Sequence, residues 1–128
     1  MTIRKTSNAL NISLWVVQLL LSLSLLWSVY MKWLSPAGEL AQMWPWTAEN
    51  PVLTKLTGVF DLLAALGLVL PMLLQIKPRL TLYAAYGLIA LMMVAIGFHA
   101  SRGEVSQITP NLFFIALAAF VAYGRRNL

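Results

Sequence analysis

The sequence contains no cysteine, and charged residues make up only 10% of its 128 positions. The lack of cysteine excludes disulfide bonds, thiolate metal sites and cysteine redox chemistry. The low charge content argues against a soluble domain, in which about 25% of residues are charged. Hydrophobic residues instead make up 60% of the chain, and the mean hydropathy is +0.78. A chain this short could not hide so much apolar surface from water, so lipid is its expected solvent.

Several functional motifs are also missing. The sequence has no nucleophilic triad, no Gly-rich phosphate loop, no HExxH motif and no pair of carboxylates suited to acid–base catalysis, so no catalytic residue is predicted. One histidine and one intramembrane aspartate are too few ligands for a metal site. The net charge of +5 is scattered at segment ends, which is typical of a topology signal and predicts no nucleic-acid partner. Each segment has too few polar residues for a channel.

Four apolar segments approach the roughly 20 residues that a helix needs to cross a bilayer. Their apolar runs are continuous and rich in Leu and Ala, which favours helices over strands. The uncharged run at residues 14–31 exceeds the apolar core of a secretory signal, about 7–15 residues, so the first segment is expected to be retained. We predict an all-α integral membrane four-helix bundle, one domain over residues 1–128, with spans at about 12–34, 52–74, 80–100 and 108–123.

Prolines lie at the expected starts of three of these helices. Pro51, Pro78 and Pro110 each fall at or near an expected first helical position, where the missing N–H costs nothing. Asn50 and Thr109 precede two of them and are suitable N-cap residues.

The pair Ser35-Pro36 has the same form, so a short interfacial helix is expected at residues 37–43. This connection also holds Trp33, Trp44 and Trp46, which suit the headgroup region of a membrane.

Lysine and arginine are distributed unequally between the two sides that four spans define. The side with both termini carries six, namely Arg4, Lys5, Lys77, Arg79, Arg125 and Arg126, and the other carries three, namely Lys32, Lys55 and Arg102. The positive-inside rule therefore predicts that both termini are cytoplasmic and that the tryptophan-rich connection faces outward.

Asp61 is the one charge in the interior of the second span. An isolated carboxylate at that depth costs a few kcal/mol, so it is expected to be paired, protonated or facing water inside the bundle. Gly58, Ala64 and Ala65 on the same helix are small and favour close helix packing, which places Asp61 toward the bundle interior. Two hypotheses stay open, a structural interhelical contact and a ligand or proton site.

Three further polar residues lie near the outer ends of the other spans. Lys32 either snorkels to the interface or turns inward to pair with Asp61. His99 is either an interfacial residue or a member of the same polar cluster. Asn111 either caps the fourth span or donates into the cluster.

Trp44 and Trp46 are expected near the mouth of a pocket around that cluster, and Arg102 in the outer turn is expected to be solvated or to bind a headgroup. The inner half of the bundle is expected to be plain packing.

Five segments of the chain have a familiar form. Residues 58–71 read GVFDLLAALGLVLP, and residues 98–104 read FHASRGE. Shorter segments are MK at residues 31–32, PNL at 110–112 and AYGRR at 122–126. Taken in their order along the chain, they resemble the DoxX-like family of small bacterial membrane proteins, over nearly the whole chain.

The resemblance implies a four-helix bundle in a bacterial inner membrane. The family is named after a thiosulfate:quinone oxidoreductase subunit, and some relatives are associated with oxidative-stress complexes. Family members often carry Glu where this chain has Asp61, which is one methylene shorter. No haem or flavin motif is evident, so a redox role would need a bound quinone or a partner protein.

Three functional hypotheses follow. The leading one is a module that binds a small amphipathic ligand, a quinone or a lipid, in an outer-leaflet pocket. The second is an accessory subunit of a membrane oxidoreductase with a soluble redox partner. The third is a scaffold or small membrane chaperone without a ligand. Enzymatic activity and homo-oligomer formation are left open. The residues assigned to the pocket are Lys32, Asp61, His99, Asn111, Arg102, Trp44 and Trp46.

Overall fold

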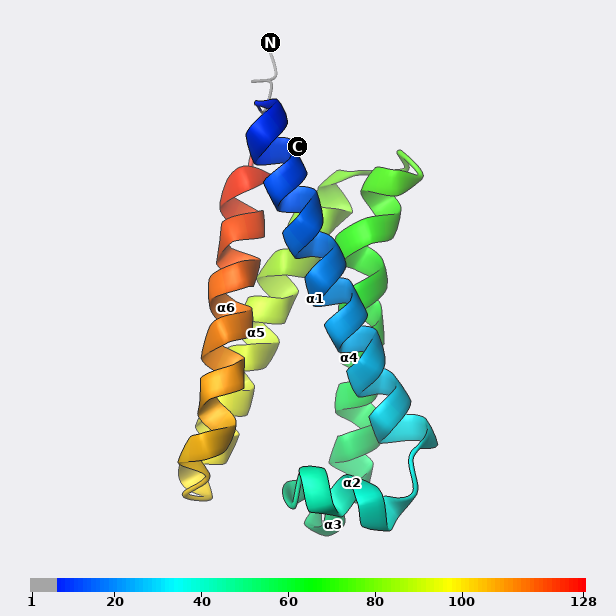
Figure 1. The fold of residues 1–128 in the computed structure, drawn as a ribbon, viewed down its shortest axis with the longest axis vertical. Coiled ribbons are helices and arrows are strands. Elements are labelled where there is room, and N and C mark those ends of the chain that lie inside the picture. Colours follow the sequence, from blue (N-terminus) through cyan, green and yellow to red (C-terminus); the bar gives the residue numbers. More distant parts are fainter. Residues whose placement is uncertain (1–6) are drawn as a thin grey trace.

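The computed structural model describes residues 7–128, and this part of the chain is almost entirely helical (Figure 1). Four helices are long and apolar enough to cross a membrane, which confirms the all-α four-helix bundle. They are α1 (Asn8–Leu34), α4 (Pro51–Leu73), α5 (Arg79–Ser101) and α6 (Val105–Gly124). Arg4 and Lys5, on which part of the orientation prediction rests, lie outside the described residues.

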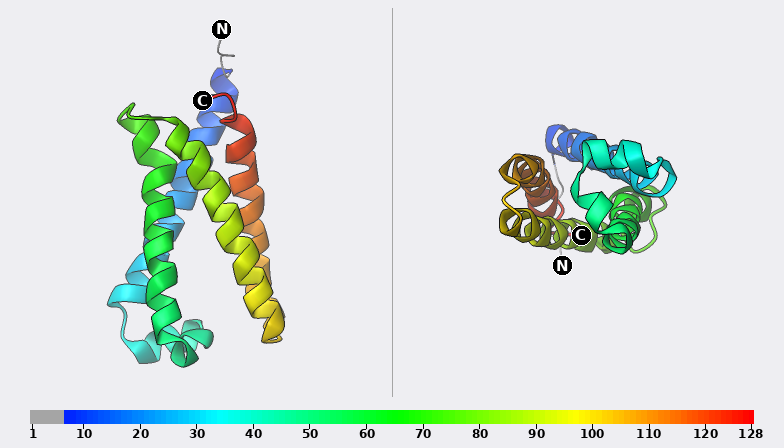
Figure 2. Two further views of the ribbon diagram at one scale, coloured as in Figure 1. Left: turned by 180° about the vertical axis from the view of Figure 1, so that it is seen from behind. Right: turned by 90° about the horizontal axis from the view of Figure 1, so that it is seen from below.

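The long helices form a ring in which α1 packs on α4, α4 on α5, α5 on α6, and α6 on α1. Neighbours in this ring run in opposite directions (Figure 1). The start of α1, the end of α6 and the α4–α5 turn lie together at what we call the terminal end. The short helices α2 (Ala37–Met43) and α3 (Trp46–Glu49) lie with the α5–α6 turn at the opposite, α2–α3 end (Figure 2).

The helix starts follow the expected signals in part. The Ser7 side chain caps α1 by accepting a hydrogen bond from Leu10 N at 3.2 Å, and Pro51 opens α4. The short helix α2 covers the expected residues, whereas α3 was not expected. Asn50 occupies the N-cap position of α4 but makes no side-chain cap hydrogen bond, and its side-chain amide donates to Trp46 O at 3.0 Å.

The fourth long helix differs more from expectation. It begins at Val105, so Thr109 is not its N-cap and Pro110 lies within the helix. The turn before it stays compact because Gln107 N donates to Glu104 O at 3.0 Å, which starts the helix one turn early.

A proline inside α4 is compensated from α5. Pro71 has no N–H to donate to Gly67 O, four residues earlier in the helix. The buried hydroxyl of Thr81 donates to that carbonyl at 3.0 Å and so satisfies it. Gly67 also allows close contact here, since a Cβ at this position would lie 2.8 Å from the Ala84 Cβ. These two contacts hold α4 against α5 near the terminal end.

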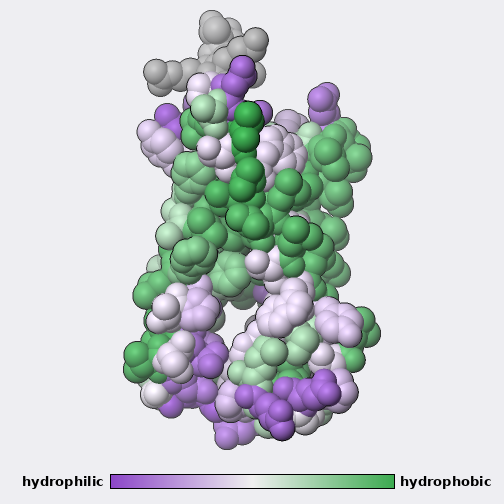
Figure 3. Space-filling model, in the orientation of Figure 1, coloured by the Kyte–Doolittle hydropathy of each residue, from purple (hydrophilic) through white to green (hydrophobic). Residues whose placement is uncertain are grey.

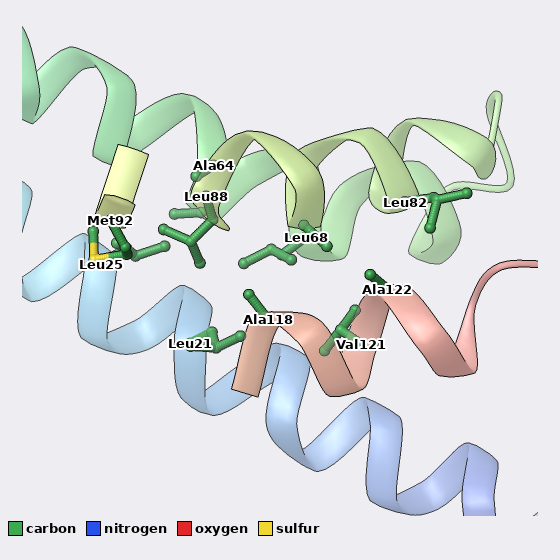
Figure 4. Packing of buried hydrophobic residues seen from close by; sticks show 12 residues of the cluster. Leu21, Leu25, Ala64, Leu68, Leu82, Leu88, Met92, Ala118, Val121 and Ala122 are labelled. Atoms are coloured by element: carbon green, nitrogen blue, oxygen red, sulfur yellow. The ribbon is translucent and has the colours of Figure 1, made fainter. Parts of the chain in front are cut away.

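The apolar core fills the half of the bundle nearer the terminal end (Figure 4). It runs from Leu82 and Val121 at that end to Leu25 and Met92 near the middle of the bundle. Outside the core, the molecule presents a broad apolar band between two polar ends (Figure 3). Such a band matches the hydrocarbon layer of a bilayer.

Candidate functional site

A cavity of about 670 Å³ takes the place of the apolar core toward the α2–α3 end. Leu25 and Met92 belong both to the core and to the cavity wall, so the cavity begins where the core stops. All four long helices contribute to its wall, and most of its lining is apolar. A volume of this size is in the range that holds a small organic ligand.

An ion pair between α1 and α4 forms the polar centre of this cavity. Lys32 Nζ donates to Asp61 Oδ2 at 2.7 Å, with the two residues only 9% and 2% exposed. The hydroxyl of Ser28 donates to the same oxygen at 2.9 Å. Within residues 7–128, Asp61 Oδ1 accepts no hydrogen bond, and Asp61 lines the cavity. One oxygen of the carboxylate is therefore without a hydrogen-bond partner among these residues.

Two tryptophans surround the ammonium group of Lys32. Its Nζ lies 5.8 Å from the ring centroid of Trp44 and 5.7 Å from that of Trp46. The Trp44 ring also packs edge-on against Trp27, with centroids 5.7 Å apart. Cation–π contacts of this kind are strengthened where water is excluded. They hold the lysine inward, so the snorkelling alternative does not apply.

His99 lines the cavity from α5 and is held by a carboxylate behind it. Its Nδ1 lies 3.2 Å from Glu104 Oε1. A carboxylate only accepts hydrogen bonds, so Nδ1 carries the proton. This leaves Nε2 without a protein partner among the described residues.

Arg102 lies outside the cavity and links two elements instead. Its guanidinium contacts Glu49 Oε2 on α3 at 2.7 Å and Glu104 Oε1 at 2.8 Å. These carboxylates raise the pKa of Arg102 above its usual value, and the hydrogen bond to Glu49 contributes most. Burial alone would raise the pKa of Glu104, but hydrogen bonds from His99 and Arg102 outweigh it and hold that pKa below its ordinary value.

Six of the seven residues that the sequence assigned to a pocket line the cavity, and Arg102 does not. The six are Lys32, Trp44, Trp46, Asp61, His99 and Asn111. Asn111 is half-buried, its amide donates to Gln107 O at 3.2 Å, and its own oxygen accepts no hydrogen bond from the described part of the chain. No group of three His, Asp or Glu side chains in the described part of the chain is arranged to hold a metal ion.

Ser28 was missed by the sequence reasoning, although a signal was present. It lies four residues before Lys32 and therefore on the same face of α1. A serine one turn from an inward-facing lysine could have been assigned to the same cluster.

The terminal end contains a second buried polar cluster, so the expectation of plain packing there was wrong. Arg125 is only 4% exposed, and burial lowers the pKa of its guanidinium from the usual value. Its Nε donates to Gln18 Oε1 and its Nη1 to Asn11 Oδ1, both at 2.8 Å. The amide of Gln18 in turn donates to Leu68 O at 2.7 Å. This cluster joins α6, α1 and α4.

The fold and this site define a small four-span membrane bundle with a polar cavity at one end. The family model described as the DoxX-like family matches residues 16–121, which is most of the chain. The chain belongs to the DoxX-like family. No curated protein and no solved structure matches it.

Proposed function

We propose that the protein binds a small amphipathic ligand, a quinone or a lipid, in the cavity around Lys32 and Asp61. The observation that supports this most directly is the free oxygen of Asp61. A buried carboxylate that has one oxygen fully paired and the other facing a cavity has unused hydrogen-bonding capacity. A ligand donor would satisfy it.

The other polar groups of the cavity support the same proposal. The ammonium group of Lys32 has three N–H donors, of which one is committed to Asp61. His99 and Asn111 each present an uncommitted atom from the opposite helix pair. A carbonyl or hydroxyl head of a ligand would bind between these groups, and its apolar part would contact residues such as Leu53 and Phe114.

For orientation we propose a bacterial inner membrane with both termini in the cytoplasm, which places the cavity in the outer leaflet. A small excess of described lysines and arginines supports this proposal, since four lie at the terminal end (Lys77, Arg79, Arg125 and Arg126) and three on the other side (Lys32, Lys55 and Arg102). A reporter enzyme that is active only outside the cytoplasm should therefore be inactive when fused after Leu128. Activity of that fusion would reverse the proposed orientation.

The ligand proposal is tested by mass spectrometry of the molecules that copurify from native membranes in a mild detergent. We expect one quinone or lipid to be several-fold enriched with the wild type over Asp61→Asn. Glu39→Gln removes an exposed carboxylate of α2 instead and should retain the molecule like the wild type. Equal amounts with wild type and Asp61→Asn would overturn the proposal.

The scaffold hypothesis has one observation in its favour, namely that Lys32 and Asp61 pair directly and join α1 to α4. Under this hypothesis no molecule is enriched with the wild type, and Asp61→Asn lowers only stability. The accessory-subunit hypothesis stays a prediction and requires that a soluble redox protein is recovered with the chain from native membranes.

A further inference from the structure

The two halves of the helix ring separate toward the α2–α3 end. The pair α1 and α4 diverges from the pair α5 and α6, as seen from both faces of the bundle (Figures 1 and 2). The space-filling view shows a deep hollow between the two pairs at this level (Figure 3). The cavity around Asp61 lies in this part of the bundle, so it extends sideways between the helices.

Residues of the cavity wall reach the lipid-facing surface. Trp27 of α1 is 50% exposed and Val94 of α5 is 72% exposed, and both line the cavity. Ser24 of α1 also lines it and is exposed. Because α1 and α5 lie diagonally in the ring, the hollow is open to the surrounding lipid from more than one side.

The α2–α3 end, by contrast, is bridged by protein. Glu49 of α3 pairs with Arg102 of the α5–α6 turn at 2.7 Å, so the contact crosses from one helix pair to the other. Near this ion pair, the ring of Trp46 on α3 packs edge-on against Phe98 on α5, with ring centroids 5.8 Å apart. Trp46 is buried, and Trp44 covers Lys32 beside it. A ligand from the aqueous side would have to displace these contacts.

The charges inside the cavity limit the head of the ligand. Lys32 and Asp61 are paired at 2.7 Å and together carry no net charge, and His99, the other titratable group of the wall, is paired with Glu104 at 3.2 Å. A charged head would add an uncompensated charge at a buried site, which is unfavourable. A neutral head that both donates and accepts would instead use Asp61 Oδ1 and the remaining donors of Lys32.

We infer that the ligand is a neutral-headed lipid with a long apolar chain, which enters from the bilayer between the two helix pairs. Its head reaches Lys32 and Asp61 while its chain stays in the hollow and in the surrounding lipid. This inference rests on the proposed function and narrows it to a class of ligand and a route.

A photoreactive diacylglycerol is a suitable probe, because its hydroxyl and ester groups are neutral and its chains are long. The full-length protein in phosphatidylcholine nanodiscs is labelled, and the labelled residues are mapped by mass spectrometry. We expect labels in the cavity wall, and several-fold fewer with a photoreactive phosphatidic acid of the same chains. Excess unlabelled long-chain diacylglycerol should compete, whereas the same head with acetyl chains should not.

The route is tested by narrowing the hollow at its surface. Ser24→Phe should reduce labelling of the cavity several-fold and leave the polar centre intact. Ser13→Phe is the matched control, because Ser13 is exposed on the same helix but lies outside the cavity wall. Equal labelling by the anionic probe, equal competition by the acetyl compound, or unchanged labelling of Ser24→Phe would overturn the inference.

Asp61→Asn separates this inference from the function on which it rests. If Asp61→Asn loses the labels, but Ser24→Phe keeps them and the acetyl compound competes as well as the long-chain one, only the inference fails. If Asp61→Asn is labelled like the wild type, the proposed polar site itself fails.

Discussion

Lys32 Nζ lies 2.7 Å from Asp61 Oδ2, and this contact joins α1 to α4 at the level where a cavity replaces the apolar core. Both groups are buried, so each depends on the other for its charge to be tolerated. The pair thus holds two helices together without filling the space between the two helix pairs. The pair is therefore buried between two helices, while the cavity beside it stays open.

The first prediction concerns this pair. Lys32→Met leaves the buried carboxylate unpaired and should lower the free energy of unfolding by about 3–5 kcal/mol. The double variant Lys32→Met/Asp61→Asn removes both charges and should regain a large part of that loss. Unfolding in mixed micelles with increasing SDS measures both.

Lys55→Met is the control for this experiment. Lys55 is an exposed lysine on α4 whose Nζ donates to Trp33 O at 3.3 Å. Its loss should lower the free energy of unfolding by less than about 1 kcal/mol. A loss from Lys32→Met as small as that from Lys55→Met would show that the buried pair does not stabilise the bundle.

The second prediction concerns the polar cluster at the terminal end. Arg125→Gln replaces the guanidinium by a shorter, uncharged amide and leaves the oxygens of Gln18 and Asn11 without their present donor. The free energy of unfolding should fall by about 1.5–3 kcal/mol, the range for hydrogen bonds to a charged group. Arg126→Gln, at an exposed neighbour, should change it by less than about 0.5 kcal/mol. Similar values for the two variants would contradict a structural role for Arg125.

This cluster also shows what the sequence could and could not predict. Continuous apolar runs and prolines identify the four long helices and α2, because these signals depend on position along the chain. They do not give the rotation of a side chain about its helix axis. In the sequence, Arg125 at a helix end therefore looks like a charge that sets the membrane orientation, although in the structure it turns inward to Gln18. Gln18 itself, a polar residue within the first apolar run, was the available signal.

The cavity residues follow the same pattern. Small neighbours on the helix place Asp61 inward from the sequence alone, but the choice of Lys32 as its partner needs the packing of α1 on α4. The pairing of Arg102 with Glu49 could not be predicted, because α3 brings Glu49 to the α5–α6 turn only in the folded bundle.

The third prediction is a dependence of stability on acidic pH. In the folded protein, burial is outweighed by hydrogen bonds from His99 and Arg102, so the pKa of Glu104 lies below its ordinary value of 4.5. A carboxyl group with a lower pKa in the folded state contributes stability that is fully present above that ordinary value. This contribution is lost as the pH falls through the folded pKa.

Melting temperatures between about pH 7 and pH 3 measure this effect in detergent. The decrease in melting temperature on acidification should be smaller in Glu104→Gln than in the wild type, because the variant has no carboxyl group to protonate at this position. Glu39→Gln should keep the wild-type decrease. Parallel curves for Glu104→Gln and the wild type would remove Glu104 as the cause.

The fourth prediction concerns the contact between α4 and α5. Gly67→Ala would place a Cβ 2.8 Å from the Ala84 Cβ, so the helices must shift apart. The free energy of unfolding should fall by about 1–3 kcal/mol, as in other overpacked interiors. Gly87→Ala meets no atom within 4 Å and should raise it by up to about 1 kcal/mol through helix propensity. A neutral effect of Gly67→Ala would show that the interface is loose at this position.

The central claim is that the cavity around Lys32 and Asp61 holds a ligand. It is tested most directly by a density map of the protein purified from native membranes and held in bilayer nanodiscs. We predict elongated non-protein density with its head within hydrogen-bonding distance of Asp61 Oδ1, and no such density in Asp61→Asn. A cavity that contains only water or is closed by side chains in the wild type would contradict the claim.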